Sequence, residues 1–194
     1  MLAKAVTDVP APDAVEGGYS YEPKWDGFRC IVRKEGDDVE LVSRGKKPLT
    51  RYFPELVAAI REHLPGSAVV DGEVVVRSGE PGAQRLDWEA LGQRIHPAES
   101  RITKLSQETP AELIAFDLLA LGDDDLTEEP LERRRALLEE CLKDAQPPVH
   151  VTPVTRDLDT ARRWFELFEG AGLDGVIAKR LGSAVEKGKI DAAA

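Results

Sequence analysis

The sequence predicts an α+β fold built on antiparallel sheets. Short apolar runs typical of strands follow one another through turn residues, and amphipathic segments typical of helices are mixed among them. Three of the turns are Asp-Gly steps, at Asp26-Gly27, Asp71-Gly72 and Asp174-Gly175, and each leads into an apolar run. Asp-Gly before alternating apolar residues is a hairpin or bulge signal, which indicates strands joined by short connections.

The first third of the chain is expected to hold strands around the first Asp-Gly step, followed by a helix. The strands are expected over 19–22, 28–34 and 39–42. The turn at 35–38 joins the last two of them. A helix is expected over 53–64, because Pro54 suits a first helical turn and Pro65-Gly66 ends the helical pattern.

The middle of the chain contains the most apolar segment. Residues 68–77 predict a strand interrupted by the second Asp-Gly step, and 87–95 predict a short helix. The run 112–121 is nearly continuously apolar, which predicts a strand buried on both faces. The acidic stretch 122–129 is expected to be a loop.

The last third is expected to alternate between helix and strand. Residues 131–144 predict a helix with Arg135 and Glu139 paired at i,i+4, and the run 133–135 of arginines is expected to be a solvated face. A strand is expected over 149–155. A helix over 158–170 follows, with a stripe expected to be core: Ala161, Trp164, Phe165 and Phe168. The third Asp-Gly step then leads into a final strand.

The composition limits the class of protein. With 194 residues, 32% of them charged and 42% hydrophobic, the chain is expected to be a soluble globular protein with a real core. No apolar stretch approaches membrane-spanning length and the N-terminus lacks a signal-peptide core, so a cytoplasmic monomer without membrane partners is expected. Cys30 and Cys141 fit no metal-binding spacing and are expected to be inert thiols.

Lys24 is the candidate nucleophile. A lysine amine is protonated at neutral pH, and burial or neighbouring cations make it a nucleophile by lowering its pKa. Lys24 lies at the first Asp-Gly step, five residues before Arg29.

Residue types that bind metals and phosphates recur elsewhere in the chain. Carboxylates such as Glu73, Asp117 and Asp174 are hard oxygen ligands of the type that Mg²⁺ prefers, usually together with substrate phosphates. The cations that could neutralise charge on a phosphoryl group are Arg29, Arg44, Lys46 and Lys179. Together with Lys24, this set suits a metal-bound phosphate ester.

Five segments, in order, resemble the motifs of the covalent nucleotidyltransferases, the class of ATP-dependent DNA and RNA ligases and mRNA capping enzymes. They are Glu22-Pro23-Lys24-Trp25-Asp26-Gly27-Phe28-Arg29, Ser43-Arg44-Gly45-Lys46, Asp71-Gly72-Glu73, Phe116-Asp117-Leu118-Leu119 and the segment from Leu173 to Arg180. Stretches outside the motifs, 91–97 and 164–170, are most similar to bacterial ATP-dependent DNA ligases of the ligase C and ligase D type. A single Lys-x-Asp-Gly is weak evidence, whereas five ordered motifs are strong.

The resemblance implies a fold, a reaction and a set of residue roles. The implied fold is two packed antiparallel β-sheets flanked by helices, with the nucleotide between the sheets. The implied catalytic residue is Lys24, which takes AMP from ATP in the presence of Mg²⁺ or Mn²⁺. The implied nucleotide-binding residues are Glu22, Arg29, Arg44, Glu73, Phe116 and Lys179, and the implied metal ligands are Asp174 and Glu73. Two plainer alternatives stay open, core packing for Phe116 and turn chemistry for the aspartates before glycine.

The resemblance also implies a nucleic-acid partner. AMP would pass from Lys24 to a 5′-phosphate of nicked or broken duplex DNA, for repair. The net charge of −10 opposes phosphate contacts, and much of the acidity lies in 123–129, away from a basic cluster over 29–51. This chain alone is therefore expected to bind DNA weakly.

Two departures from the family pattern leave alternatives open. The fourth motif begins with Asp174 in place of the usual Glu, a side chain one methylene shorter, and the family's fifth motif, a Lys-x-Lys strand, is not recognisable. Residues 1–181 are expected to be the adenylation domain and 182–194 a tail, without the OB-fold domain into which family members continue. The alternatives are an RNA ligase, a GTP-using capping-type enzyme and a non-catalytic AMP-binding module.

Overall fold

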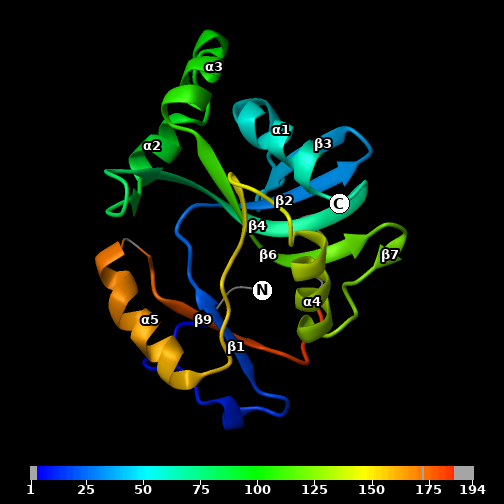
Figure 1. The fold of residues 1–194 in the computed structure, drawn as a ribbon, viewed down its shortest axis with the longest axis vertical. Coiled ribbons are helices and arrows are strands. Elements are labelled where there is room, and N and C mark those ends of the chain that lie inside the picture. The colour runs from blue at the N-terminus through cyan, green and yellow to red at the C-terminus, as the bar shows by residue number, and fades with distance from the viewer. Residues whose placement is uncertain (1–3, 172, 186–194) are drawn as a thin grey trace.

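Two β-sheets organise the chain (Figure 1). The computed structural model describes residues 4–171 and 173–185. The small sheet pairs β1 (Tyr19–Pro23) antiparallel with β9 (Val176–Arg180). The large sheet consists of β2 (Phe28–Glu35), β3 (Asp38–Ser43), β4 (Ser67–Ser78), β5 (Arg85–Leu86), β6 (Ala111–Leu121), β7 (Asp124–Asp125) and β8 (Val149–Val151).

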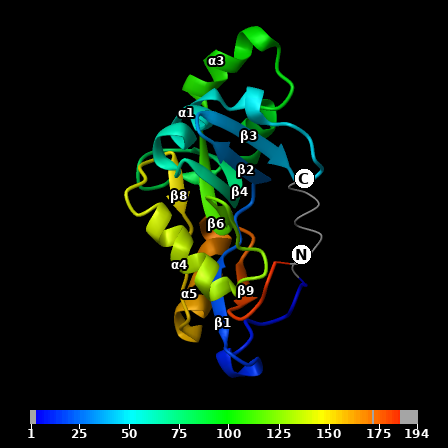
Figure 2. The same cartoon turned by 90° about the vertical axis from the view of Figure 1, so that its right-hand side faces the viewer.

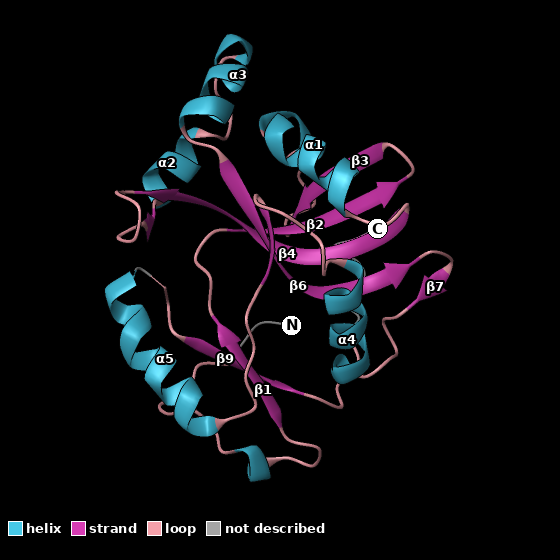
Figure 3. Ribbon diagram, viewed as in Figure 1, coloured by secondary structure: helices cyan, strands magenta, loops and turns pink. Residues whose placement is uncertain are grey.

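Helices flank both sheets (Figures 2 and 3). They are α1 (Pro54–His63), α2 (Trp88–Gln93), α3 (Glu99–Glu108), α4 (Leu131–Cys141) and α5 (Leu158–Ala171). The helices α1, α2 and α4 pack on strands of the large sheet, and α5 packs on the small one. The predicted fold of two packed antiparallel sheets flanked by helices is confirmed, with one local exception: β8 runs parallel to β6. No helix in the described part of the chain is long and apolar enough to cross a bilayer.

The two faces of the large sheet belong to different hydrophobic clusters. Alternate residues of a strand point to opposite faces. Cys30 and Val32 of β2 belong to the main hydrophobic core beneath α1, whereas Ile31 belongs to a smaller cluster with Leu119 and Val185. The face that carries Ile31 also carries Arg29, two residues earlier.

The second Asp-Gly step does not interrupt its strand, contrary to the prediction. β4 continues through Asp71 and Gly72, and the register of its pairing with β6 shifts there: Asp71 lies opposite Asp117 and Gly72 opposite Ala115. Phe116 is therefore the extra residue of a β-bulge, which is a common way of re-aiming a side chain beside an active site. A Cβ on Gly72 would lie 2.7 Å from the carbonyl oxygen of Ile114, so glycine permits this close approach of the strands.

Four other expectations need correction. The helix α3 and the short strand β7 within the acidic loop were not expected from the sequence. Arg134 is only 2% exposed and bonds to Asp117, so the arginine run is not a solvated face. Phe165 is 47% exposed, so the aromatic stripe of α5 is core only in part. The α4 pair of Arg135 and Glu139 is confirmed, with 2.7 Å between Nε and Oε1.

Candidate active site

The loop that carries Lys24 lies against the loop of the third Asp-Gly step. The backbone N–H of Lys24 donates to the carbonyl oxygen of Gly175 at 2.8 Å, and the N–H of Asp174 donates back to the carbonyl oxygen of Lys24 at 3.2 Å. Lys24 Nζ lies 2.5 Å from Asp174 Oδ2, and the two side chains are 44% and 47% exposed. The structure therefore brings together two residues that are 150 positions apart. It leaves the side chain of Lys24 nearly half exposed.

The second Asp-Gly strand supports the same loop from the other side. The N–H of Gly27 donates to Glu73 Oε1 at 3.2 Å. A Cβ on Gly27 would lie 2.2 Å from the carbonyl oxygen of Val74, so no larger residue fits where the loop crosses β4. Trp25 anchors the loop further, because its Nε1 donates to Thr152 Oγ1 at 2.8 Å. The loop that carries Lys24 is thus held in place by its contacts with Glu73 and Thr152.

Carboxylates surround this loop. Burial raises the pKa of Glu73 to about 7, although Arg29 and the Gly27 N–H act in the opposite direction. Burial and the nearby charge of Asp174 also raise the pKa of Asp26, while Lys24 lowers it. Turn chemistry is the plainer alternative for Asp26, and its proximity to Asp174 makes it a further candidate ligand as well.

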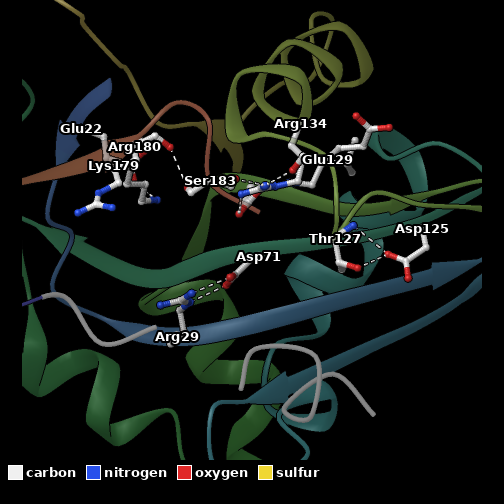
Figure 4. Close-up of polar contacts among 12 residues, drawn as sticks. Glu22, Arg29, Asp71, Asp125, Thr127, Glu129, Arg134, Lys179, Arg180 and Ser183 are labelled. Atoms are coloured by element: carbon white, nitrogen blue, oxygen red, sulfur yellow. Dashed lines mark hydrogen bonds and ion pairs between the residues drawn. The ribbon is translucent and has the colours of Figure 1, made fainter. Parts of the chain in front are cut away.

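Arg29 is fixed by a buried partner. Its Nε and Nη2 donate to the two carboxylate oxygens of Asp71 at 2.5 and 2.6 Å (Figure 4). Asp71 is fully buried. Burial alone would lower the pKa of Arg29, but the hydrogen bonds and charge of Asp71 raise it. A bidentate pair of this kind fixes the guanidinium plane.

Phe116 lies between cations at the junction of the two sheets. Lys179 Nζ is 4.4 Å and Arg29 Cζ 4.8 Å from the centroid of the Phe116 ring. Glu22 of β1 forms an ion pair with Lys179 of β9 (Figure 4). Phe116 is 7% exposed and does not belong to the main core cluster. Its ring therefore forms part of a polar site, which suits a stacking surface better than core packing.

Two predicted phosphate or metal residues lie elsewhere. Arg44 lies in the exposed loop after β3 and lines a cavity of about 400 Å³ together with Gly27 and Arg29. Asp117 is 1% exposed, and its carboxylate is bound by Arg134 Nε and Nη2 at 2.8 and 3.1 Å. Asp117 is therefore a structural ion-pair partner and not a candidate metal ligand. The spacing of Leu131, Arg134 and Leu138 on one helical face is the signal that would have placed Arg134 inside.

The sequence relatives of this chain include DNA ligases. The sequence family described as "ATP dependent DNA ligase domain" matches residues 1–192. DNA ligase C of Mycobacterium tuberculosis is 59% identical over 183 residues, which cover 92% of this chain and 48% of that protein. DNA ligase C1 of Mycolicibacterium smegmatis is 53% identical, with 97% of this chain and 53% of that protein covered.

Solved structures agree with these sequence relatives. The ligase domain from M. tuberculosis LigD superimposes with a TM-score of 0.64 at 27% identity, over 91% of this chain and 54% of that one. A mycobacterial DNA ligase D complexed with ATP superimposes with a TM-score of 0.61 at 29% identity, over 87% and 50% of the two chains. This chain spans about half the length of the curated relatives it matches. It belongs to the family of ATP-dependent DNA ligase domains.

Proposed function

We propose that this chain is the adenylating part of a DNA ligase and that Lys24 is its nucleophile. The observation that supports the proposal most directly is the contact of 2.5 Å between Lys24 Nζ and Asp174 Oδ2, which joins the loops of the first and third Asp-Gly steps. Family membership supplies the nucleotide, ATP.

The reaction begins with the release of Lys24 from its ion pair. One Nζ proton passes to Asp174 Oδ2, and the nitrogen lone pair then attacks the α-phosphorus of ATP. The N–P bond forms as the bond from the α-phosphorus to the bridging oxygen breaks, and pyrophosphate leaves with that electron pair. A second Nζ proton passes to solvent, and AMP remains on Lys24 as a phosphoramidate.

The base is proposed to stack on Phe116. Lys179 Nζ now lies over that ring, so a purine has to displace it. The displaced ammonium can then turn toward the α-phosphate, where it would neutralise charge that develops during attack. Glu22, released from Lys179, is left as a hydrogen-bond acceptor for an amino group of the base. Arg29 stays with Asp71, and its guanidinium remains over the ring of Phe116.

The carboxylates near Lys24 fit a hard divalent cation only in part. In the described ranges, no cluster of three or more His, Cys, Asp or Glu side chains is arranged to hold a metal by itself. Mg²⁺ and Mn²⁺ sites of this class complete their ligands with substrate phosphates, so Asp174, Asp26 and Glu73 would supply the protein's share. The ion would neutralise the phosphates of ATP when bound. A nearby cation would also favour the ionised form of Glu73.

The acceptor is proposed to be a 5′-phosphate of nicked or broken duplex DNA, with sealing by a 3′-hydroxyl. The names of the ligase relatives support DNA as the acceptor. The net charge of −10 argues that this chain binds DNA weakly and that the other half of such proteins, with the OB-fold domain, supplies most contacts. We infer a cytoplasmic monomer for the chain itself.

The mass of the intact protein after incubation with ATP and Mg²⁺ tests the proposal. Wild-type chain and the control Lys104→Ala, an exposed lysine of α3, should each gain one AMP, and Lys24→Ala should gain none. An adduct on Lys24→Ala would contradict the assignment. So would the lack of an adduct on wild type even when the C-terminal half is added, which would favour a non-catalytic AMP-binding module. GTP in place of ATP, and nicked RNA in place of nicked DNA, separate the capping-type and RNA-ligase alternatives.

A further inference from the structure

The chain passes between the two sheets twice in the described residues. The loop 24–27 leaves β1 of the small sheet and enters β2 of the large one. Residues 152–155, the connector, leave β8 of the large sheet and return to β1, where Tyr21 and Thr155 exchange backbone hydrogen bonds of 2.8 and 2.9 Å. Figure 1 shows the loop in blue and the connector in yellow. Both segments therefore contribute to the spacing between the sheets.

Thr152, at the start of the connector, uses all of its polar groups within the protein. Its backbone N–H donates to the carbonyl oxygen of Ala115 at 2.9 Å, and its carbonyl oxygen accepts from Arg135 Nη2 of α4 at 2.6 Å. Its Oγ1 accepts the indole N–H of Trp25 at 2.8 Å. Because Thr152 is 1% exposed, no water can replace a partner that is lost, so the three bonds are expected to persist together.

These bonds place Thr152 between the two halves of the proposed reaction. Ala115 is the neighbour of Phe116, on whose ring the base is proposed to stack, and Trp25 is the neighbour of Lys24. One residue and two hydrogen bonds thus connect the base site on the large sheet to the loop of the nucleophile. Attack requires the reacting atoms to lie about 3–3.5 Å apart, and a misplacement of about 1 Å costs on the order of 100-fold in rate.

The ring of Trp25 has a second support on the large sheet. Arg77 Cζ of β4 lies over this ring, 5.8 Å from its centroid. Arg77 Nε lies 2.8 Å from Glu112 Oε2 of β6, and Glu112 Oε1 lies 2.7 Å from His150 Nε2 of β8. The hydrogen bond to Thr152 fixes the direction of the indole, and the arginine over its face fixes its plane.

We propose that Thr152 is a positioning residue of the adenylation step: through the indole of Trp25, its hydroxyl sets where Lys24 lies relative to the bound base. The proposal rests on the proposed function and adds to it a residue that lies outside the five motif segments. Because Thr152 is buried, it acts through its neighbours and not on the substrate. Its loss is therefore expected to slow the attack without weakening the binding of ATP.

Initial rates of adduct formation test the proposal, read from intact mass over a range of ATP concentrations with Mg²⁺. Thr152→Val keeps the shape of the side chain and removes the acceptor, whereas Thr152→Ser keeps the acceptor. Thr127→Val is the matched control, because Thr127 is 7% exposed and its hydroxyl donates to Asp125 Oδ1 of β7 at 2.6 Å (Figure 4). Thermal melting of each variant measures how much stability it loses.

Thr152→Val should lower the rate at saturating ATP by about tenfold and keep the half-saturating ATP concentration within about twofold of wild type. Thr152→Ser should restore most of the rate, and Thr127→Val should react like wild type even if it melts as low as Thr152→Val. Trp25→Phe removes the donor of the same bond, so adding Thr152→Val to it should slow the reaction no further.

Three results would each overturn the proposal. The first is an equal rate for Thr152→Val and Thr127→Val. The second is a change in the half-saturating ATP concentration alone. The third is a double variant of Trp25→Phe and Thr152→Val in which the two losses of rate multiply, because the residues would then act independently.

A second measurement is independent of the reaction with ATP. An amine-reactive ester, added without nucleotide, labels Lys24 more slowly while its amine is paired with Asp174. Thr152→Val should raise this labelling by about threefold relative to Lys104, an exposed lysine of α3, as expected when an exposed ion pair opens. Equal labelling of Lys24 in wild type and variant would contradict the positioning role. If wild type forms no adduct, the proposed function fails, and the labelling alone decides whether Thr152 positions Lys24.

Discussion

Replacement of Arg134 by alanine removes a buried ion pair that joins three parts of the chain. Arg134 Nε and Nη2 bind the carboxylate of Asp117 in β6. Nη1 donates to the carbonyl oxygens of Glu129 at 2.6 Å and Ser183 at 2.8 Å (Figure 4). Asp117 is 1% exposed, so its carboxylate would lose the guanidinium without gaining water. Removing one member of a buried pair costs about 3–5 kcal/mol. For a domain of this size, that lowers the melting temperature by roughly 10 °C.

Thermal melting followed by circular dichroism measures this effect, and the neighbouring arginine is the matched control. Arg133 approaches Glu129 only at 3.6 Å, and its side chain is 61% exposed. Arg133→Ala should therefore change the free energy of unfolding by less than about 0.5 kcal/mol. If Arg134→Ala and Arg133→Ala melt within about 2 °C of each other, the ion pair does not stabilise the fold as inferred.

Three further perturbations have defined outcomes. Asp174→Asn should slow adduct formation at least about tenfold by removing the proton acceptor, whereas Asp174→Glu should retain most activity, as initial rates from intact mass would show. Gly27→Ala should melt at least about 5 °C lower than Gly66→Ala, because its Cβ would overlap a backbone carbonyl while that of Gly66 meets nothing within 4 Å. The raised pKa of Glu73, about 7 against 4.5, means that the folded state binds the proton more tightly, so stability falls as the pH rises from about 4.5 to 7 and then levels off. This loss amounts to at most about 3 kcal/mol. Urea unfolding at pH 5 to 8 should show that Glu73→Gln lacks it, and the same change of unfolding free energy with pH in the two proteins would refute the inference.

Local signals located most elements of the fold because each is encoded within a few residues. Pro54 does open α1, and the apolar run ending at Leu121 does form a buried strand. The helix α3 was not predicted, because its residues are mostly polar and Leu105 is its one buried residue. It projects from the body of the molecule (Figure 1).

Long-range pairing could not be read from such signals. β1 pairs with β9 across more than 150 positions, and this pairing is what brings Lys24 to Asp174. The bulge at Phe116 depends on the register between β4 and β6, which no segment encodes alone. The burial of Arg134 and Arg94 also depends on long-range contacts, because each guanidinium is paired with a carboxylate from another element.

The residues of the candidate site were predicted from their types. The structure adds which of the ion pairs among them can open. Three cations expected to meet phosphate each have a carboxylate partner: Lys24 with Asp174, Lys179 with Glu22, and Arg29 with Asp71. Asp71 is fully buried, so separating it from Arg29 would leave a buried charge, and that pair stays intact. Lys24 and Asp174 are nearly half exposed, and a pair of this kind contributes only about 0–1 kcal/mol. The pair that has to open in the proposed reaction is therefore the one that opens most easily, whereas the pair that holds Arg29 over the Phe116 ring does not open.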